Sequence, residues 1–174
     1  MKLALKKIIV VLTLFFINFN LNADVPSYVD FKYILNQSTA GKKAQSFLKN
    51  KLEQGLKKLS EQEKNILKEE KQIIEQKKLI KPDEYKNKVD ALRTKVLNLQ
   101  KERDKLLKSV SEQRLVARNE LLKNLNPIIS EYMQEKKIRM VVDKKSILLA
   151  DQNLDITKQI IELLNKKLKS IKLN

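Results

Sequence analysis

The sequence has no cysteine, histidine or tryptophan, and it has only 2 glycines, 3 prolines and 5% aromatic residues. The lack of cysteine excludes disulfides and thiolate chemistry. The lack of histidine removes the commonest general base and the commonest ligand of transition metals. Strand-rich sandwiches and barrels need many turns, which two glycines do not supply. These absences argue against an all-β fold and against most kinds of enzyme.

Charged and aliphatic residues dominate what remains. Of the 174 residues, 33% are charged and 42% are hydrophobic, and 37 basic against 21 acidic residues give a net charge of +16. This bias is typical of a long helix or a coiled coil, and the apolar content is too high for a disordered chain. The length suits one domain.

Residues 1–23 have the pattern of a secretory signal peptide. Three lysines within the first seven residues precede an almost wholly apolar run over residues 8–19, and Ala23 is a small residue that suits cleavage. The run is shorter than the about 20 apolar residues that a membrane-spanning helix needs. We therefore expect cleavage after Ala23 and export. Leu21 is not the small residue usual at its position, so a retained membrane anchor is the alternative.

Residues 42–126 are predicted to form a long helical hairpin whose tip lies near residues 81–83. Proline is tolerated in the first turn of a helix but not in its interior, so we expect Ile80 to end the first helix and Asp83 to open the second. Arms of about 40 residues would reach about 60 Å. The first arm contains one heptad row of apolar residues: Leu52, Leu59, Ile66, Ile73 and Ile80.

A second row is needed because a coiled coil buries two positions of each heptad. In the first arm we assign this row to residues that become charged towards the tip: Leu56, Glu63, Glu70 and Lys77. The second arm is better filled, by Tyr85, Val89, Leu92, Val96, Leu99, Arg103, Leu106 and Val110. Near its base, Pro127 predicts a kink or a short break after Asn126, followed by a last helical stretch to about Lys137.

Both ends of the chain predict short strands. Residues 25–35 suit a strand that runs into a helical turn, and residues 139–143 and 147–150 suit two more strands. Asp155 is placed as the N-cap of a final amphipathic helix. The predicted fold is mainly α with a small β body, and the hairpin is inserted between strands of that body. The body comprises residues 24–41 and 127–174. A base of this size is marginal alone, and oligomerisation would complete it.

Most of the positive charge is expected on the arms. Loss of the signal peptide removes three lysines and leaves a net charge of +13. Residues 42–81 carry 12 lysines and 6 acids, and residues 82–126 carry 11 basic and 7 acidic residues, so the hairpin holds +10. Such a field attracts acidic proteins, anionic lipid or lipopolysaccharide, and nucleic acid. A solvated coiled-coil surface explains the same charge, and export separates the chain from nucleic acid, so we expect no nucleic-acid binding in the cell.

No catalytic, cofactor-binding or metal-binding pattern stands out. Ser60, Ser109 and Ser111 have no histidine to activate them, and the sequence holds no Gly-x-Ser-x-Gly elbow, glycine-rich phosphate loop or EF-hand pattern. Neighbouring acids on exposed helices, such as Glu69 and Glu70, are usually solvated or paired along the helix. We predict a protein that is not an enzyme and that uses no cofactor or metal.

The order of these elements and the residues at the two ends resemble the Skp/OmpH family of periplasmic chaperones. At the N-terminal end the resemblance lies in Tyr28-Val29-Asp30-Phe31, Ile34-Leu35 and Ala40-Gly41-Lys42. At the C-terminal end it lies in Asn126-Pro127-Ile128, Met140-Val141-Val142-Asp143, Ile147-Leu148-Leu149-Ala150, Asp155-Ile156-Thr157, and Ile160, Ile161, Leu164 and Asn165. The hairpin matches the family only in length and character.

The resemblance implies a homotrimer whose strands build a barrel-like body and whose hairpins project as tentacles around a cavity. It also implies an ATP-independent holdase that shields unfolded outer-membrane β-barrel proteins in the periplasm and prevents their aggregation. In this sequence the trimer body would use Val29, Phe31, Val141, Val142, Ile147 and Leu149.

Four apolar residues beside the predicted rows are the candidates for contact with such clients: Leu67, Ile74, Leu97 and Leu107. They would form a partly apolar face that the hairpin itself does not use. Unfolded barrel strands, which aggregate by edge pairing, would be held there by many weak contacts. The alternative is a coiled-coil structural or adaptor protein of the cell envelope, which would bind a dedicated folded partner and would not need the strand-bearing base.

Overall fold

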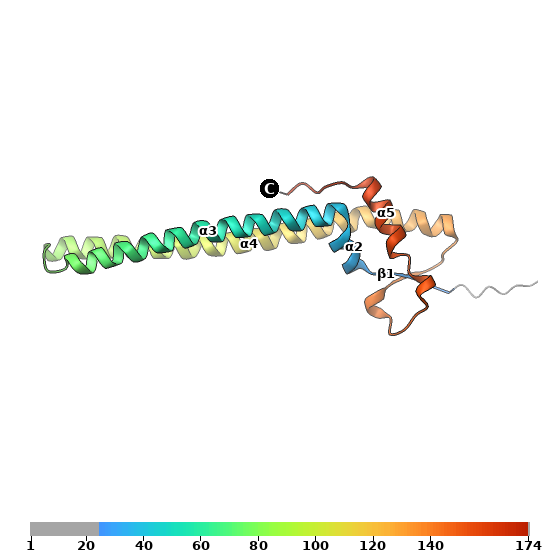
Figure 1. Cartoon of the computed structure of the whole chain (residues 1–174), viewed down its shortest axis with the longest axis horizontal. Helices are drawn as coiled ribbons and strands as arrows, with labels where there is room; N and C mark the ends of the chain where they lie inside the picture. The colour runs from blue at the N-terminus through green and yellow to red at the C-terminus, as the bar shows by residue number, and fades with distance from the viewer. Residues whose placement is uncertain (1–24, 174) are drawn as a thin grey trace, which may run out of the picture.

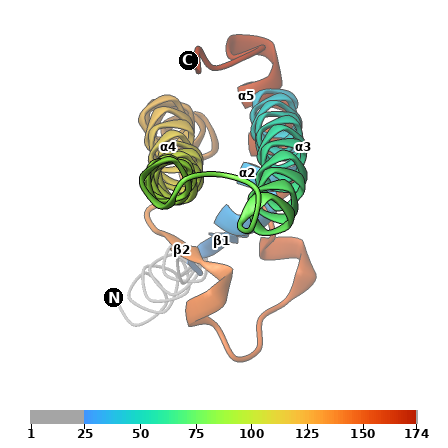
Figure 2. The ribbon, with the colours of Figure 1, turned by 90° about the vertical axis from the view of Figure 1, so that its left-hand side faces the viewer.

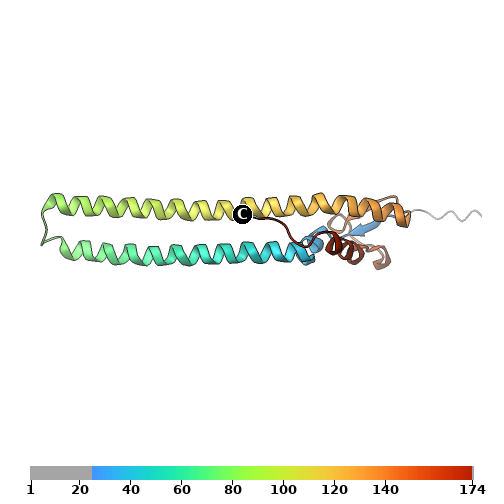
Figure 3. The ribbon, with the colours of Figure 1, turned by 90° about the horizontal axis from the view of Figure 1, so that it is seen from above.

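Two long helices lie side by side and make up most of the molecule (Figure 1). The computed structural model describes residues 25–173, so the predicted signal peptide lies outside the described residues. Helix α3 (Thr39–Gln76) has 38 residues and helix α4 (Pro82–Lys136) has 55. The two remain neighbours along the whole length of α3, as the view from above shows (Figure 3). At 1.5 Å per residue, α3 is about 57 Å long. The predicted hairpin is confirmed.

The tip of the hairpin is a short turn. Pro82 is the first residue of α4, where the missing N–H is no loss, and two acids follow it near the positive end of the helix dipole. Helix α3 ends at Gln76 rather than at the predicted Ile80. The reason is a turn in which the N–H groups of Leu79 and Ile80 both donate to the Gln76 carbonyl oxygen, at 2.8 and 3.2 Å.

The body at the base of the arms joins the two ends of the described chain. Its elements are β1 (Ser27–Val29), α2 (Phe31–Gln37), β2 (Val141–Asp143), the single-turn 3₁₀ helices η1 (Lys144–Ser146) and η2 (Gln152–Leu154), and α5 (Thr157–Lys167). Strand β1 pairs in parallel with β2, with Ser27 opposite Val141. Seen from the tip, α5 lies on one side of the arms, and the sheet and the 3₁₀ segments lie on the other (Figure 2).

The hydrophobic core of the body forms where β1, α2, α3, α4 and α5 meet. Its centre has no exposed surface and consists of Val29, Ile34, Ala40, Leu125, Ile160 and Leu164. Burial of a valine, leucine or isoleucine side chain stabilises a fold by about 1.5–3 kcal/mol relative to leaving it in water. The base of α4 therefore belongs to the same packed unit as the two chain ends, and the arms extend from a fixed support.

Polar side chains fasten the start of α3 to this core. The N–H of Thr39 donates to Asn165 Oδ1 of α5 at 2.7 Å, and the N–H of Gly41 donates to the buried N-cap Ser38 Oγ at 3.2 Å. These bonds satisfy two of the four N–H groups that a helix start leaves without partners. Gly41 is required at this place because a Cβ there would collide with the carbonyl oxygen of Leu35.

Of the kink or short break predicted at Pro127, the break is wrong, because α4 continues through this residue. Proline inside a helix costs about 3 kcal/mol through a lost hydrogen bond and a clash. Leu125 and Ile128 on either side of it are 0% and 1% exposed, and Ile129 is also buried. Burial of three such side chains contributes more than one proline costs, so the core holds the helix intact.

The base has two strands rather than the predicted three. Residues 148 and 149 form a bend, residues 147 and 150 have no regular structure, and within the described chain no strand pairs with them. After β2, the Asp143 carboxylate accepts a hydrogen bond from the N–H of Lys145 at 3.3 Å and turns the chain into η1. Leu148 and Leu149 are 97% and 91% exposed. The apolar run predicted a strand, but a strand needs a partner edge that one chain does not offer here.

Side-chain caps set the bounds of the two short helices. Strand β1 is shorter than the predicted strand because Asp30 accepts a hydrogen bond from the N–H of Tyr33 at 2.8 Å and starts α2. Asp155 accepts a hydrogen bond from the N–H of Thr157 at 2.9 Å at the start of α5, although the N-cap position itself is Ile156. The helix start predicted at Asp155 is therefore correct to within one residue.

Candidate functional site

The two arms are held in one register by polar contacts between them. Lys95 Nζ lies 2.6 Å from Glu69 Oε2, Gln62 Nε2 donates to Glu102 Oε2 at 3.3 Å, and Arg103 lies 3.7 Å from Glu63. Near the tip, Lys88 Nζ donates to Gln76 Oε1 at 2.8 Å. These contacts align α3 and α4 along their length, so each residue of one arm has a defined neighbour on the other.

The first predicted heptad row of α3 is confirmed. Leu59 and Ile73 are 4% and 5% exposed, and Leu52, Ile66 and Ile80 are half-buried. The assignment of the second row is wrong, because every member of it is exposed: Leu56, Glu63, Glu70 and Lys77. The second row lies three residues after the first instead of four, at Gly55, Gln62 and Glu69, all half-buried.

The hydrophobic pattern of the sequence does not indicate this second row, because its residues are small or polar. Gly55 lets Leu106 of α4 approach so closely that a Cβ on residue 55 would lie 2.7 Å from Leu106 Cδ1. Gln62 and Glu69 are tolerated in this half-buried row because the side chain of each binds a polar or charged side chain of α4. In α4 the predicted row is half-buried or buried with one exception, Val96, which is 48% exposed.

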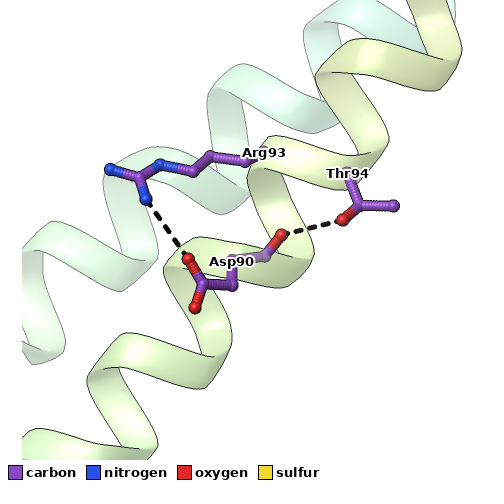
Figure 4. A network of polar contacts seen from close by, with 3 residues as sticks. All are labelled: Asp90, Arg93 and Thr94. Atoms are coloured by element: carbon purple, nitrogen blue, oxygen red, sulfur yellow. Dashed lines mark hydrogen bonds and ion pairs between the residues drawn. The ribbon is translucent and has the colours of Figure 1, made fainter.

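The charged side chains on the surface of the arms form exposed ion pairs. Some of these pairs lie within one helix, and others join α3 to α4. Figure 4 shows one on α4, where Arg93 lies 3.2 Å from Asp90 and the Thr94 hydroxyl donates to the Asp90 carbonyl oxygen at 3.0 Å. At the far end of α4, a hydrogen bond from Lys136 to Glu135 and the charge of that carboxylate raise the pKa of Lys136. Exposed pairs of this kind contribute little to stability because water and salt screen them.

The four candidate client-contact residues all lie on the surface of the arms. Leu67 and Ile74 of α3 are 57% and 60% exposed, and Leu97 and Leu107 of α4 are 63% and 49% exposed. Six further exposed apolar residues of the hairpin escaped the sequence interpretation: Phe47, Leu56, Leu79, Val96, Leu115 and Val116. Leu56 and Val96 were missed because the sequence placed both in the buried rows.

The six residues expected in a trimer body have different environments in the chain. Val29 is fully buried in the core, and Phe31 and Val141 pack against that core at its margin. Val142 and Ile147 are half-buried and Leu149 is almost fully exposed. The first three residues therefore stabilise the single chain, while the last three keep surface that this chain does not cover.

The described residues offer neither a metal-binding cluster nor a membrane-spanning helix. Within residues 25–173, no group of three or more acidic side chains is arranged to hold a metal ion. Across the same residues, none of the helices has the length and hydrophobicity needed to span a bilayer.

The fold is that of a mainly helical protein in which a small β-containing body carries one long helical hairpin. Residues 27–164, from β1 into α5, match the sequence model of a family described as outer membrane protein (OmpH-like). The match covers most of the chain, so the chain belongs to the OmpH-like family. No curated protein matches the sequence.

A solved structure has the same fold. It is the crystal structure of a protein described as an outer membrane chaperone (OmpH-like) from Caulobacter crescentus CB15, with a TM-score of 0.79. The sequence identity is 21%, and the similarity covers 86% of this chain and 90% of the other. At this identity the similarity establishes the mainly α fold with its small sheet and long arms.

Proposed function

We propose that this chain is an ATP-independent holdase chaperone that binds unfolded outer-membrane β-barrel proteins in the periplasm and prevents their aggregation before membrane assembly. The observation that carries the proposal is the exposure of leucine and isoleucine side chains along two arms that extend far beyond the core. A contiguous exposed apolar patch marks a surface that binds another protein or a membrane. The family membership and the chaperone description of the Caulobacter protein support the same role.

The proposed mechanism needs no chemical step. Unfolded barrel strands alternate apolar and polar residues and aggregate through their unpaired edges. Contacts at separate points such as Leu67 and Leu107 would each be weak, but several arms around one client would raise the local concentration of binding groups. The client would thus be retained by many weak contacts and released without nucleotide hydrolysis.

The proposed assembly is a homotrimer. A sheet of two three-residue strands is small for independent stability, and Met140, Leu148 and Leu149 next to it are 56%, 97% and 91% exposed. Association of three bodies would cover these side chains and would place three hairpins around one cavity. A stable monomer at micromolar concentration, measured by light scattering, would contradict this assembly.

Export through a cleaved signal peptide would place the protein in the periplasm with its clients. The basic arms would also attract anionic lipid or lipopolysaccharide at the membrane surface. N-terminal sequencing of the protein from a periplasmic extract should begin at Asp24. Recovery of the uncleaved chain with the membrane fraction would instead indicate a retained anchor.

The test is suppression of aggregation. A urea-unfolded outer-membrane barrel protein is diluted into buffer with and without one trimer equivalent of the mature chain, and light scattering is followed in the presence and absence of ATP. We expect scattering to fall equally with and without ATP. The double variant Leu67→Ser/Leu107→Ser should suppress less, while Asn65→Ser/Asn98→Ser, which changes exposed polar residues on the same arms, should act like the parent chain.

Failure of the parent chain to suppress scattering at one trimer per client would refute the holdase. Capture of one folded envelope protein without any effect on unfolded clients would identify the structural or adaptor role instead.

A further inference from the structure

The two broad faces of the hairpin differ in chemistry. Consecutive residues of a helix point about 100° apart, so the contact of Gln62 with Glu102 and the contact of Glu63 with Arg103 lie on opposite sides of the buried seam. The first side also carries the Glu69–Lys95 pair. We call the second side, on which Glu63 lies, the α2 face, because α2 folds against it at the base of the arms.

A groove opens on the α2 face at the base of the arms, between α2, α3 and α4. Its floor is apolar and includes Leu35, Leu48, Leu52 and Leu121. Its charged lining residues are Lys42 and Lys49 from α3 and Arg114 and Arg118 from α4, and no acidic residue lines it. The groove thus joins an apolar floor to four positive charges.

Both arginines line the groove, and Arg118 also lines a neighbouring hollow that contains Asp30 and Asp143. Arg114 and Arg118 are exposed and lie four residues apart on one side of α4. Within the described residues neither makes a hydrogen bond or an ion pair. Lys49 lies 3.7 Å from Glu53, but both side chains are more than half exposed, so this pair is weak. An arginine fork binds a carboxylate through two parallel hydrogen bonds.

The groove continues towards the tip as an apolar strip. Leu56 lies one heptad beyond Lys49 on α3, and Leu107 lies one heptad beyond Arg114 on α4, so both belong to the α2 face. They are 42% and 49% exposed. Leu67 follows on the same side of α3, eleven residues from Leu56, which is about 16 Å along the helix. Along this face the positive positions of the groove are followed by apolar positions, and the acidic Glu63, which is paired with Arg103, lies between Leu56 and Leu67.

We propose that the α2 face binds an extended segment of unfolded polypeptide that carries acidic and apolar side chains in alternation. Its carboxylates would pair with Arg114, Arg118 and the two groove lysines, and its apolar side chains would lie on the floor and on Leu56 and Leu107. The absence of acids from the groove gives the charge complementarity. An extended chain spans about 3.3 Å per residue, so about five client residues would match the strip from Leu56 to Leu67. The inference rests on the proposed holdase function and names the client segment that the arms select.

The experiment measures binding of fluorescently labelled peptides to the assembled mature protein by anisotropy. The peptides alternate valine with aspartate, with serine or with lysine. We expect the aspartate peptide to bind best. Arg114→Gln/Arg118→Gln should weaken its binding about tenfold and leave the serine peptide within about twofold. The matched control Lys101→Gln/Lys105→Gln removes two exposed charges with the same spacing on α4, and it should change neither.

A second variant keeps the test decisive if the arginine variant loses its helical circular dichroism signal. Lys42→Gln/Lys49→Gln, on the opposite wall of the groove, should produce the same selective loss. Equal weakening by the groove variants and by the lysine control would show a general attraction to a basic surface and would overturn the proposal. A loss of binding to phosphatidylglycerol vesicles with unchanged peptide binding would assign the groove to lipid and would also overturn it.

The two proposals fail separately. If the parent chain suppresses aggregation but the groove variants bind the aspartate peptide normally, the groove assignment is wrong and the holdase function stands. If the aspartate peptide binds through the groove but the parent chain suppresses no aggregation, the groove assignment stands and the holdase function is wrong.

Discussion

Replacement of Gln62 by leucine should stabilise the hairpin. Gln62 lies in the second buried row of α3, and its Oε1 atom is buried without a hydrogen-bond partner among the described residues. A buried acceptor without a partner costs about 1–3 kcal/mol. The substitution removes that cost and buries more apolar surface between the arms. It also removes the exposed 3.3 Å hydrogen bond to Glu102, which contributes about 0.5–1.5 kcal/mol.

The net effect is an increase in the free energy of unfolding of about 1–2 kcal/mol, which corresponds to a rise in Tm of about 2–8 °C for a chain of this size. Circular dichroism at matched protein concentration, with heat and with urea, measures both quantities. The matched control is Gln72→Leu, an exposed position of the same helix, which should change the stability by less than about 0.5 kcal/mol. If Gln62→Leu lowers the stability, or does no better than Gln72→Leu, the assignment of Gln62 to the buried row is refuted.

Three further substitutions test the support of the arms by the same unfolding measurements. Gly41→Ala should destabilise the protein by about 1–3 kcal/mol, because the new methyl group meets the carbonyl oxygen of Leu35. In the matched control Gly55→Ala the methyl group meets only the flexible side chain of Leu106, so the loss of stability should be less than half as large. Leu125→Ala should cost about 2–5 kcal/mol, because this side chain has no exposed surface, and a cost below 1 kcal/mol would contradict the core described above. Asn165→Ala should cost about 0.5–2 kcal/mol by removing the acceptor for the first N–H of α3, whereas Asn165→Asp, which keeps an acceptor, should retain most of the stability.

The candidate site was partly visible in the sequence. Leu67 and Ile74 fall between the heptad rows, so their exposure follows from local helical geometry alone. The groove at the base was not visible, because it forms only where α2 folds back beside the arms and brings Leu35 next to Arg118. Residues so far apart in the chain come together through packing, and no local pattern marks them.

By itself the sequence determined the hairpin, its tip at Pro82 and the first buried row of α3, because helix periodicity and proline chemistry act over a few residues. The tertiary structure decided the features that depend on distant partners. It moved the second row to Gly55, Gln62 and Glu69, because close approach of the arms favours small or paired polar residues there. It kept α4 continuous through Pro127, because core burial outweighs the cost of one proline. It also left residues 147–150 without a strand partner, because strand pairing is set by a neighbouring edge and not by the composition of the strand.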